Sequence, residues 1–446
     1  MIAGTGSGCG KTTVVCSVLG ALQGRKLSLR SYKCGPDYID PMLHSKVLGV
    51  PCRNLDSFLC GEETLKYLFA SKSLSHCVSV IEGVMGYYDG LSGISTTASS
   101  HHIAQTLKAP VVLVVNCKGK SLSVAAEVQG FLQFTPNRIK AVILNGVSSG
   151  SYPMYKRIIE THTGTEVLGF LPIVPEAVFE SRHLGLVTAQ EITNLRKKVY
   201  LLAEQAGKTI DLDRLLEIAR DAGELEYEPI NVQHLPVSAR IGIAQDFAFC
   251  FYYQDSIELL QMMGANFIPF SPVVDTVLPP NLHGLLLGGG YPELYARQLS
   301  LNRPMLDSIA QAVQSGMPTI AECGGFMLLC KELKTLKGDV HRMAGVLNTS
   351  VEMTNKLSNF GYVTLTAKRD NMLCGEGESF PAHEFHYSTA SDTGDGFTAC
   401  KANGTVWSSA HVGESLYAGY PHLHLWGNRN AARRFMERCI AYRRAL

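Results

Sequence analysis

The feature that most constrains the fold is a glycine-rich loop at residues 4–13, GTGSGCGKTT, which lies between a short apolar run and a helical pattern. In a phosphate-binding loop of this kind, backbone N–H groups surround the phosphates and a lysine reaches the β- and γ-phosphoryl oxygens. The strict pattern has glycine where this chain has Thr5, and Gly6 stands where partition-type ATPases carry a second, signature lysine. We therefore predict an ATP-binding domain rather than a partition-type switch. The predicted ATP-binding residues are Gly4, Thr5, Gly8, Gly10, Lys11, Thr12 and Thr13.

Residues 1–227 alternate short β-branched runs with helical stretches, which predicts an α/β domain with a doubly wound parallel sheet. Buried strands are predicted at 78–81, 111–115 and 142–144, and two amphipathic helices between 193 and 227 close the domain. Ligands of such sheets bind at the carboxyl ends of the strands. Residues 228–238, EPINVQHLPVS, carry two prolines and no periodicity, so they are predicted to form a linker. A second α/β domain is predicted at 239–446.

Two segments of the first domain place acidic residues where strand ends are expected. KCGPDYIDPMLH (33–44) contains Asp37 and Asp40, and VIEGVMGYYDG (80–90) contains Glu82 and Asp89. A carboxylate at the end of a strand in this fold binds Mg²⁺ or orients water, so Glu82 and the Thr12 hydroxyl are predicted to be Mg²⁺ ligands. A solvated turn would contain the same residue types, and that alternative stays open for both segments.

The second domain contains a candidate nucleophile, Cys323, in TIAECGGF (319–326). An apolar strand, a sharp turn of small residues and an apolar helix follow one another here, which is the pattern of a nucleophile elbow with cysteine in place of serine. We expect the helix dipole to favour the thiolate. The preceding run LLLGGG (285–290) offers backbone N–H groups at Gly289 and Gly290 for an oxyanion hole.

The general base for this cysteine must be a histidine that is distant in the sequence. GYPHLHLW offers His422 and His424, while AHEFHYS offers His383 and His386. The HExH spacing of the second segment does not match the HExxH pattern of zinc proteases, which places both histidines on one face of a helix.

Composition excludes several classes of partner. Forty Lys and Arg residues balance 39 Asp and Glu, so no basic surface indicates nucleic acid or an anionic membrane. The longest apolar runs are too short for a membrane span. The glycine loop begins at residue 4, which leaves no signal peptide in this sequence, and the 13 cysteines show no CxxC spacing. We therefore expect a cytoplasmic enzyme.

Eight motifs, in chain order, resemble those of the cobyrinate a,c-diamide synthase family. They are GPDYIDP, VIEGVMGYYDG, ESRHLGLV, FCFYY, LGGGYPEL, AECGG, HEFHYS and GYPHLHLW, and they extend over essentially the whole chain. The resemblance implies a dethiobiotin-synthetase-like ATPase fused to a class I glutamine amidotransferase domain. It further implies that ATP with Mg²⁺ activates the a and c acetates of cobyrinate, a corrin, as acyl phosphates, and that glutamine supplies ammonia, in cobalamin biosynthesis.

The resemblance also assigns roles to residues. The nucleophile falls on Cys323 and its base on His422, with His424 as the alternative; acceptor activation falls on Asp37, Asp40, Glu82 and Asp89. Ordinary class I amidotransferases have glutamate two residues after the base, where this chain has His424, so we predict a Cys–His dyad. His183 in ESRHLGLV and the HEFHYS segment are further candidates for lining the corrin site.

Three alternatives stay open from the sequence. Ni-sirohydrochlorin and hydrogenobyrinate a,c-diamide synthases share these motifs, and a nucleotide switch could carry a degenerate amidotransferase module. The intact Cys323 and His422 argue against the switch. Members of the family start several residues before the glycine loop, so we expect the printed start to be truncated or misassigned.

Overall fold

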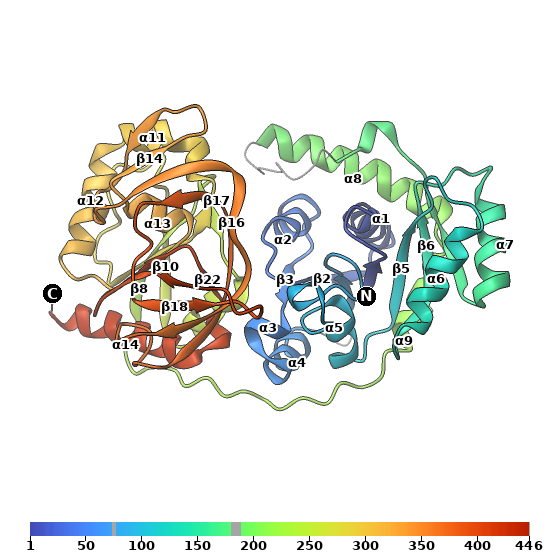
Figure 1. Cartoon of the computed structure of the whole chain (residues 1–446), viewed down its shortest axis with the longest axis horizontal. Helices are drawn as coiled ribbons and strands as arrows, with labels where there is room; N and C mark the ends of the chain where they lie inside the picture. Colours follow the sequence, from blue (N-terminus) through green and yellow to red (C-terminus); the bar gives the residue numbers. More distant parts are fainter. Residues whose placement is uncertain (74–76, 180–188, 446) are drawn as a thin grey trace. The chain divides into compact units, whose positions relative to one another are not determined.

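The computed structural model describes residues 1–73, 77–179 and 189–445, which form two compact units, Met1–Pro229 and Ile230–Leu446 (Figure 1). Each unit contains a predominantly parallel sheet with helices packed on it. Residues 221–238, between the last helix of the first unit and the first strand of the second, contain neither helix nor strand. The predicted fold class, two α/β domains of which the first is a doubly wound phosphate-loop domain, is confirmed.

The first unit is built on a seven-stranded sheet in the order β3-β2-β4-β1-β5-β6-β7, and every neighbouring pair is parallel. Its strands are β1 (Ile2–Gly4), β2 (Ser28–Cys34), β3 (Cys52–Leu55), β4 (Cys77–Glu82), β5 (Val111–Asn116), β6 (Ile139–Asn145) and β7 (Glu166–Leu171). The three predicted strands are β4, β5 and β6. Strand β1 lies between β4 and β5, so the glycine loop emerges beside the end of β4.

Helices cover both faces of this sheet because both faces are apolar. In β5, Val112 and Val114 pack in one hydrophobic cluster while Leu113 and Val115 pack in another, as expected for side chains that alternate across a strand. The helices are α1 (Lys11–Gly24), α2 (Ile39–Met42), α3 (Ser57–Cys60), α4 (Glu62–Ala70), α5 (Ser100–Thr106), α6 (Ser123–Gln133), α7 (Tyr152–Thr163), α8 (Ala189–Thr209) and α9 (Leu212–Arg220). The predicted closing helices are α8 and α9.

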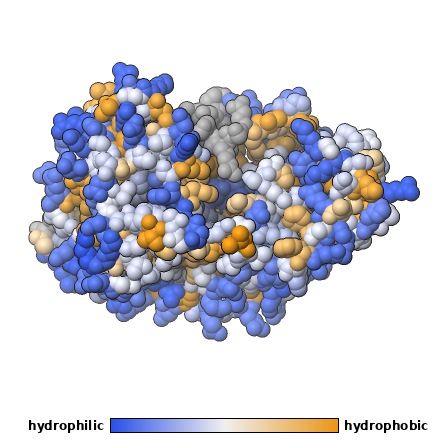
Figure 2. Space-filling view, in the orientation of Figure 1, coloured by the Kyte–Doolittle hydropathy of each residue, from blue (hydrophilic) through white to orange (hydrophobic). Residues whose placement is uncertain are grey.

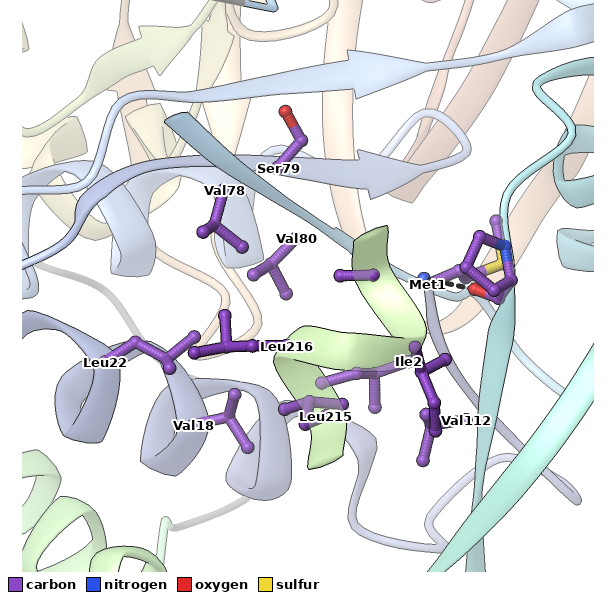
Figure 3. A pocket seen from close by; sticks show the side chains of 13 residues that line it. Met1, Ile2, Val18, Leu22, Val78, Ser79, Val80, Val112, Leu215 and Leu216 are labelled. Carbon is purple, nitrogen blue, oxygen red and sulfur yellow. Dashed lines mark hydrogen bonds between the residues drawn. The ribbon is translucent and has the colours of Figure 1, made fainter. Parts of the chain in front are cut away.

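A small apolar cavity of about 40 Å³ lies in the first unit, where α1 and α9 approach β1 and β4 (Figure 3). Val18, Leu22, Val80, Leu215 and Leu216 are among the side chains that line it. A lining that is mostly apolar offers few polar partners for water or for a charged ligand. The cavity is therefore a packing feature of the core.

The second unit has a six-stranded sheet in the order β10-β8-β11-β13-β21-β20, parallel except for its last pair. These strands are β8 (Ala239–Ala244), β10 (Ala265–Phe270), β11 (Gly284–Leu287), β13 (Thr319–Glu322), β20 (His411–Val412) and β21 (Leu416–Gly419). Its helices are α10 (Gln254–Met262), α11 (Ala296–Leu301), α12 (Arg303–Gln314), α13 (Gly324–Leu329) and α14 (Arg429–Ala445). The turn from β13 into α13 carries the predicted nucleophile.

Two further sheets, of two and seven strands, complete this unit. A two-stranded sheet pairs β9 (Phe249–Phe251) with β12 (Gly289–Gly290). The other sheet contains β14 (Glu332–Lys334), β15 (Val340–Arg342), β16 (Ser350–Ala367), β17 (Ser379–Ala390), β18 (Phe397–Cys400), β19 (Val406–Ser409) and β22 (His422–Leu423). Strand β22 pairs with β17, which sets His422 opposite His383.

The hydropathy of the surface and of the helices agrees with the mixed polar and apolar composition of the sequence. On the face shown in Figure 2, hydrophobic residues form scattered spots among hydrophilic ones, the usual mixture on a folded protein. Within the described residues, no helix is both long and apolar enough to cross a membrane. All thirteen cysteines are free.

Candidate active sites

The glycine loop joins β1 to α1 directly. Gly10 precedes the helix with φ of 95°, a left-handed conformation that favours glycine. A Cβ atom at Gly10 would lie 2.0 Å from Nδ2 of Asn145, whose amide also donates to the Cys9 carbonyl at 3.0 Å. Asn145 at the end of β6 therefore holds the loop from the side, a contact that the sequence pattern did not predict.

Lys11 is buried at the start of α1. Its ammonium donates to the carbonyl oxygens of Gly6 at 2.9 Å and Met85 at 2.5 Å. Burial lowers the pKa of Lys11, and the nearby charge of Lys33 acts in the same direction. Thr12 and Thr13 follow in the first turn of α1. The predicted ATP-binding residues therefore lie on the loop from Gly4 to Gly10 and on the first turn of the helix that follows it.

A cluster of charged side chains lies at the adjoining strand ends. Strand register sets Lys33 of β2 beside Glu82 of β4. The Lys33 ammonium lies 2.9 Å from Oε1 of Glu82 and 2.5 Å from Oδ2 of Asp40. The Thr12 hydroxyl donates to the same Glu82 oxygen at 2.7 Å. Topology therefore unites three segments that are far apart in the sequence.

His44 completes this cluster from a π-helical turn, Leu43–Val47. Its Nε2 lies 3.1 Å from Oε2 of Glu82, and both side chains are fully buried. Burial opposes the charge of each, yet Lys33 and His44 hold the pKa of Glu82 well below its usual value. Conversely, burial and the neighbouring Glu82 raise the pKa of Asp40 to about 7. Glu82 is thus the permanent anion of the cluster.

Asp37 and Asp89 bind the backbone of their own loops. One oxygen of Asp37 accepts from the N–H groups of Ile39 at 2.7 Å and Asp40 at 3.2 Å. Asp89 accepts from the Gly86 N–H at 2.8 Å. The four predicted acidic residues therefore divide into a pair that contacts Lys33, Asp40 and Glu82, and two residues that shape their own loops, Asp37 and Asp89.

The donor set of this site suits Mg²⁺. Thr12, Asp40 and Glu82 provide hydroxyl and carboxylate oxygens, which Mg²⁺ prefers, and this ion needs only one or two protein carboxylates when nucleotide phosphates and water fill the other positions. Across the residues that the structure describes, no group of three or more His, Cys, Asp or Glu side chains could hold a metal ion by itself. The oxygen donors of Thr12, Asp40 and Glu82 therefore fit a magnesium ion whose other ligands are phosphate and water.

Cys323 lies at the sharp turn between β13 and α13. Its backbone has φ of 48° and ψ of −99°, which is strained for a residue other than glycine. Burial raises the pKa of the Cys323 thiol, and the carboxylate of Glu293 raises it further. The Gly324 N–H at the start of α13 lowers this pKa, in the direction expected at a helix N-terminus, but the loss of solvation outweighs it.

The glycine run packs directly against this turn. A Cβ atom at Gly324 would lie 3.2 Å from the backbone nitrogen of Gly290, and one at Gly289 would lie 2.5 Å from Cε1 of His422. Small residues are needed at both positions because the backbones approach so closely. The arrangement adds Gly324, the residue after the nucleophile, to the oxyanion candidates Gly289 and Gly290.

The two candidate bases have different surroundings. His422 is buried, with its Cε1 near Gly289 and its Nδ1 3.6 Å from Oε2 of Glu322. His424 is also buried, but its ring lies 4.8 Å from that of Tyr253. Burial lowers the pKa of His424 to about 3, so it stays neutral.

The HEFHYS segment forms a polar network in β17. Burial lowers the pKa of His383 to about 3. His386 stacks on Tyr420 with ring centroids 3.7 Å apart and lies 3.2 Å from Glu384. Tyr420 follows Gly419, whose carbonyl accepts from the Cys323 N–H at 2.8 Å. His183, the other candidate for lining the corrin site, lies outside the described residues.

Comparisons with known proteins assign a domain family to each unit. Residues 1–184 match the CobQ/CobB/MinD/ParA nucleotide binding domain, and residues 240–430 match the CobB/CobQ-like glutamine amidotransferase domain. A cobyrinate a,c-diamide synthase of Caldanaerobacter subterraneus subsp. tengcongensis is 40% identical, over 100% of this chain and 99% of the relative. Those of Fusobacterium nucleatum and Listeria innocua are each 40% identical; the first match covers 96% of this chain and 97% of the relative, and the second covers 96% of each.

A nucleotide-binding domain joined to a glutamine amidotransferase domain defines a glutamine-dependent amide-forming ligase. The full-length similarity is more specific than this class. The chain belongs to the cobyrinate a,c-diamide synthase family, and the resemblance inferred from its motifs is confirmed.

Proposed function

We propose that this enzyme amidates the a and c acetate groups of cobyrinate, using ATP with Mg²⁺ and ammonia released from glutamine. The observation that carries this proposal is 40% identity to cobyrinate a,c-diamide synthases along the whole chain. The reaction belongs to cobalamin biosynthesis, and the substrates are the corrin, glutamine and ATP.

The first unit activates the acetate. An acetate oxygen attacks the γ-phosphorus of ATP and ADP leaves, which converts a poor acylating group into an acyl phosphate. Ammonia then attacks the carbonyl carbon, and phosphate leaves with the bonding electrons. Lys11 stabilises the negative charge of the transferring phosphoryl group. Mg²⁺, held by Thr12 and Glu82, supplies further charge neutralisation when it is bound.

The Lys33–Glu82–Asp40–His44 cluster supports this assignment because it is ordered by ion pairs and hydrogen bonds. Glu82 is an anion over the physiological range, whereas Asp40 is close to half-protonated near neutral pH. Asp37 and Asp89 accept hydrogen bonds from the backbone of their own loops. We propose that these two residues help to place the reacting acetate.

The second unit releases ammonia. His422 takes the proton of the Cys323 thiol while the sulfur attacks the amide carbon of glutamine. Backbone N–H groups of Gly289 and Gly290 stabilise the oxyanion. The tetrahedral intermediate expels ammonia with the proton returned by His422, and water hydrolyses the glutamyl thioester. The raised pKa of Cys323 supports this order, because a protonated thiol needs a base.

One experiment tests the acceptor. Cobyrinate, hydrogenobyrinate and Ni-sirohydrochlorin are incubated in parallel with the enzyme, glutamine and ATP–Mg²⁺, and amide products are resolved by mass spectrometry. The proposal predicts a diamide of cobyrinate with the highest kcat/KM of the three. A higher kcat/KM for either other macrocycle would assign the enzyme to that substrate instead.

A further inference from the structure

Glu322, the residue immediately before the nucleophile, lies beside the proposed base. It ends β13, and its side chain is 11% exposed. We infer that the Glu322 carboxylate positions His422 and stabilises its charged form, so that the site is a Cys–His–Glu constellation rather than a dyad. This inference rests on the proposed roles of Cys323 and His422.

The two oxygens of this carboxylate have separate contacts. Oε1 accepts from the backbone N–H of Leu423 at 3.3 Å. Oε2 lies 3.6 Å from Nδ1 of His422. Because Leu423 is the next residue after His422, one contact fixes the carboxylate against the same short strand, β22, that presents the imidazole.

The elbow explains how neighbouring residues can serve different functions. Glu322 is still in the sheet, where it pairs with Gly419 of β21, whereas Cys323 adopts the strained turn conformation. The backbone therefore changes from strand to sharp turn between the two residues. The acid comes from the position before the nucleophile, and the usual position two residues after the base is not needed.

The residue in that usual position cannot perform the function. His424 is buried against Tyr253, and burial lowers its pKa to about 3. A neutral imidazole supplies no negative charge to stabilise an imidazolium. Glu322 does supply it, in a site whose low polarity strengthens the interaction.

The Glu322–His422 contact leaves room to shorten during the reaction. A separation of 3.6 Å exceeds hydrogen-bond length. Catalytic contacts commonly shorten when substrate binds or charge develops. A proton moving from Cys323 to His422 would create the positive charge that draws the carboxylate closer.

The test compares Glu322→Gln and Glu322→Asp in the wild-type background and in a His422→Asn background. Gln keeps an oxygen acceptor for the Leu423 N–H but removes the charge. Glutaminase kcat should fall roughly 10²-fold in Glu322→Gln, with Asp restoring part of it, while KM for glutamine changes little. Adding Glu322→Gln to His422→Asn should cause no further loss, because the carboxylate acts through the imidazole.

Controls separate positioning from stability. Synthesis from ammonium salts should be unchanged in every Glu322 variant, and Glu332→Gln, which alters a carboxylate hydrogen-bonded to Ser350 elsewhere in the unit, should keep full glutaminase activity. Wild-type kcat in Glu322→Gln, an additional loss in the His422→Asn background, or a loss of ammonia-dependent synthesis would each overturn the inference. Glutaminase activity that survives Cys323→Ala would instead overturn the proposed function.

Discussion

The two proposed active sites handle charge in opposite ways. The nucleotide site holds the buried side chains of Lys33, Glu82 and His44 in direct ion-pair contact. In the amidotransferase site, burial keeps Cys323 protonated, and charge develops only during the reaction. A bound nucleotide brings several charges that a prearranged cluster must match. Glutamine hydrolysis needs a proton acceptor only while the Cys323 sulfur attacks the amide.

The largest expected loss of synthesis comes from substitutions in the nucleotide site. Lys11→Ala and Glu82→Gln should lower synthesis ~10²–10³-fold with either glutamine or ammonium salts, because acyl phosphate formation precedes nitrogen attack. ADP release and amide formation measure it. The exposed Lys46→Ala is the matched control and should behave as wild type. Near-normal ammonia-dependent turnover in Lys11→Ala would remove the glycine loop from the mechanism.

The next effect distinguishes the two histidines of the amidotransferase site. His422→Asn should lower glutaminase kcat on the order of 10²-fold, since the general base is lost. His424→Asn should retain most of the kcat per folded molecule, because His424 packs against Tyr253. Glutamate release and circular dichroism check both points. A larger loss in His424→Asn would reverse the assignment of the base.

A smaller effect is expected on stability, from the raised pKa of Asp40 in the nucleotide site. Asp40 has a pKa of about 7 in the folded protein, against about 3.9 when unfolded. The native state therefore holds a proton that the unfolded chain releases, so this stabilising contribution is lost as pH rises from about 4 through 7. Relative to Asp40→Asn, the wild-type free energy of unfolding should fall over that range. Urea denaturation measures it, and a difference independent of pH would contradict the prediction.

The smallest effect comes from an ion pair outside both sites. Arg434 holds the pKa of Glu378 down to about 2, and both side chains are more than a third exposed. Glu378→Gln should cost less than about 1 kcal/mol at pH 7. The folded-state pKa is lowered, so the difference should be present above pH 4 and vanish toward pH 2. A change in either reaction rate would show that the two sites depend on distant surface charge.

Local patterns predicted the elements that carry the chemistry. The glycine loop, the strands β4, β5 and β6 and the elbow at Cys323 all follow from short stretches of sequence, because each needs a particular order of apolar, glycine and polar residues. The carboxyl ends of parallel strands meet at one edge, which is why Glu82 could be placed near Thr12.

Local patterns could not predict contacts that depend on the topology of the sheet. The pairing of Lys33 with Glu82 depends on strand register, and the approach of Asn145 to Gly10 depends on the order of the sheet. Glu322 was visible only as part of the elbow, since nothing in its spacing indicates a contact with a residue one hundred positions later. Its signal is chemical: an acidic residue at the buried end of a strand needs a polar partner.

Separation of the two sites is the central claim, and the nitrogen source tests it directly. Cys323→Ala should lose glutamine-dependent amidation and retain synthesis from ammonium salts within about twofold of wild type, because the thiol serves only glutamine hydrolysis. Amide formation on cobyrinate with ATP–Mg²⁺ is measured with each nitrogen source. A folded Cys323→Ala enzyme that is equally inactive with ammonia would contradict the account.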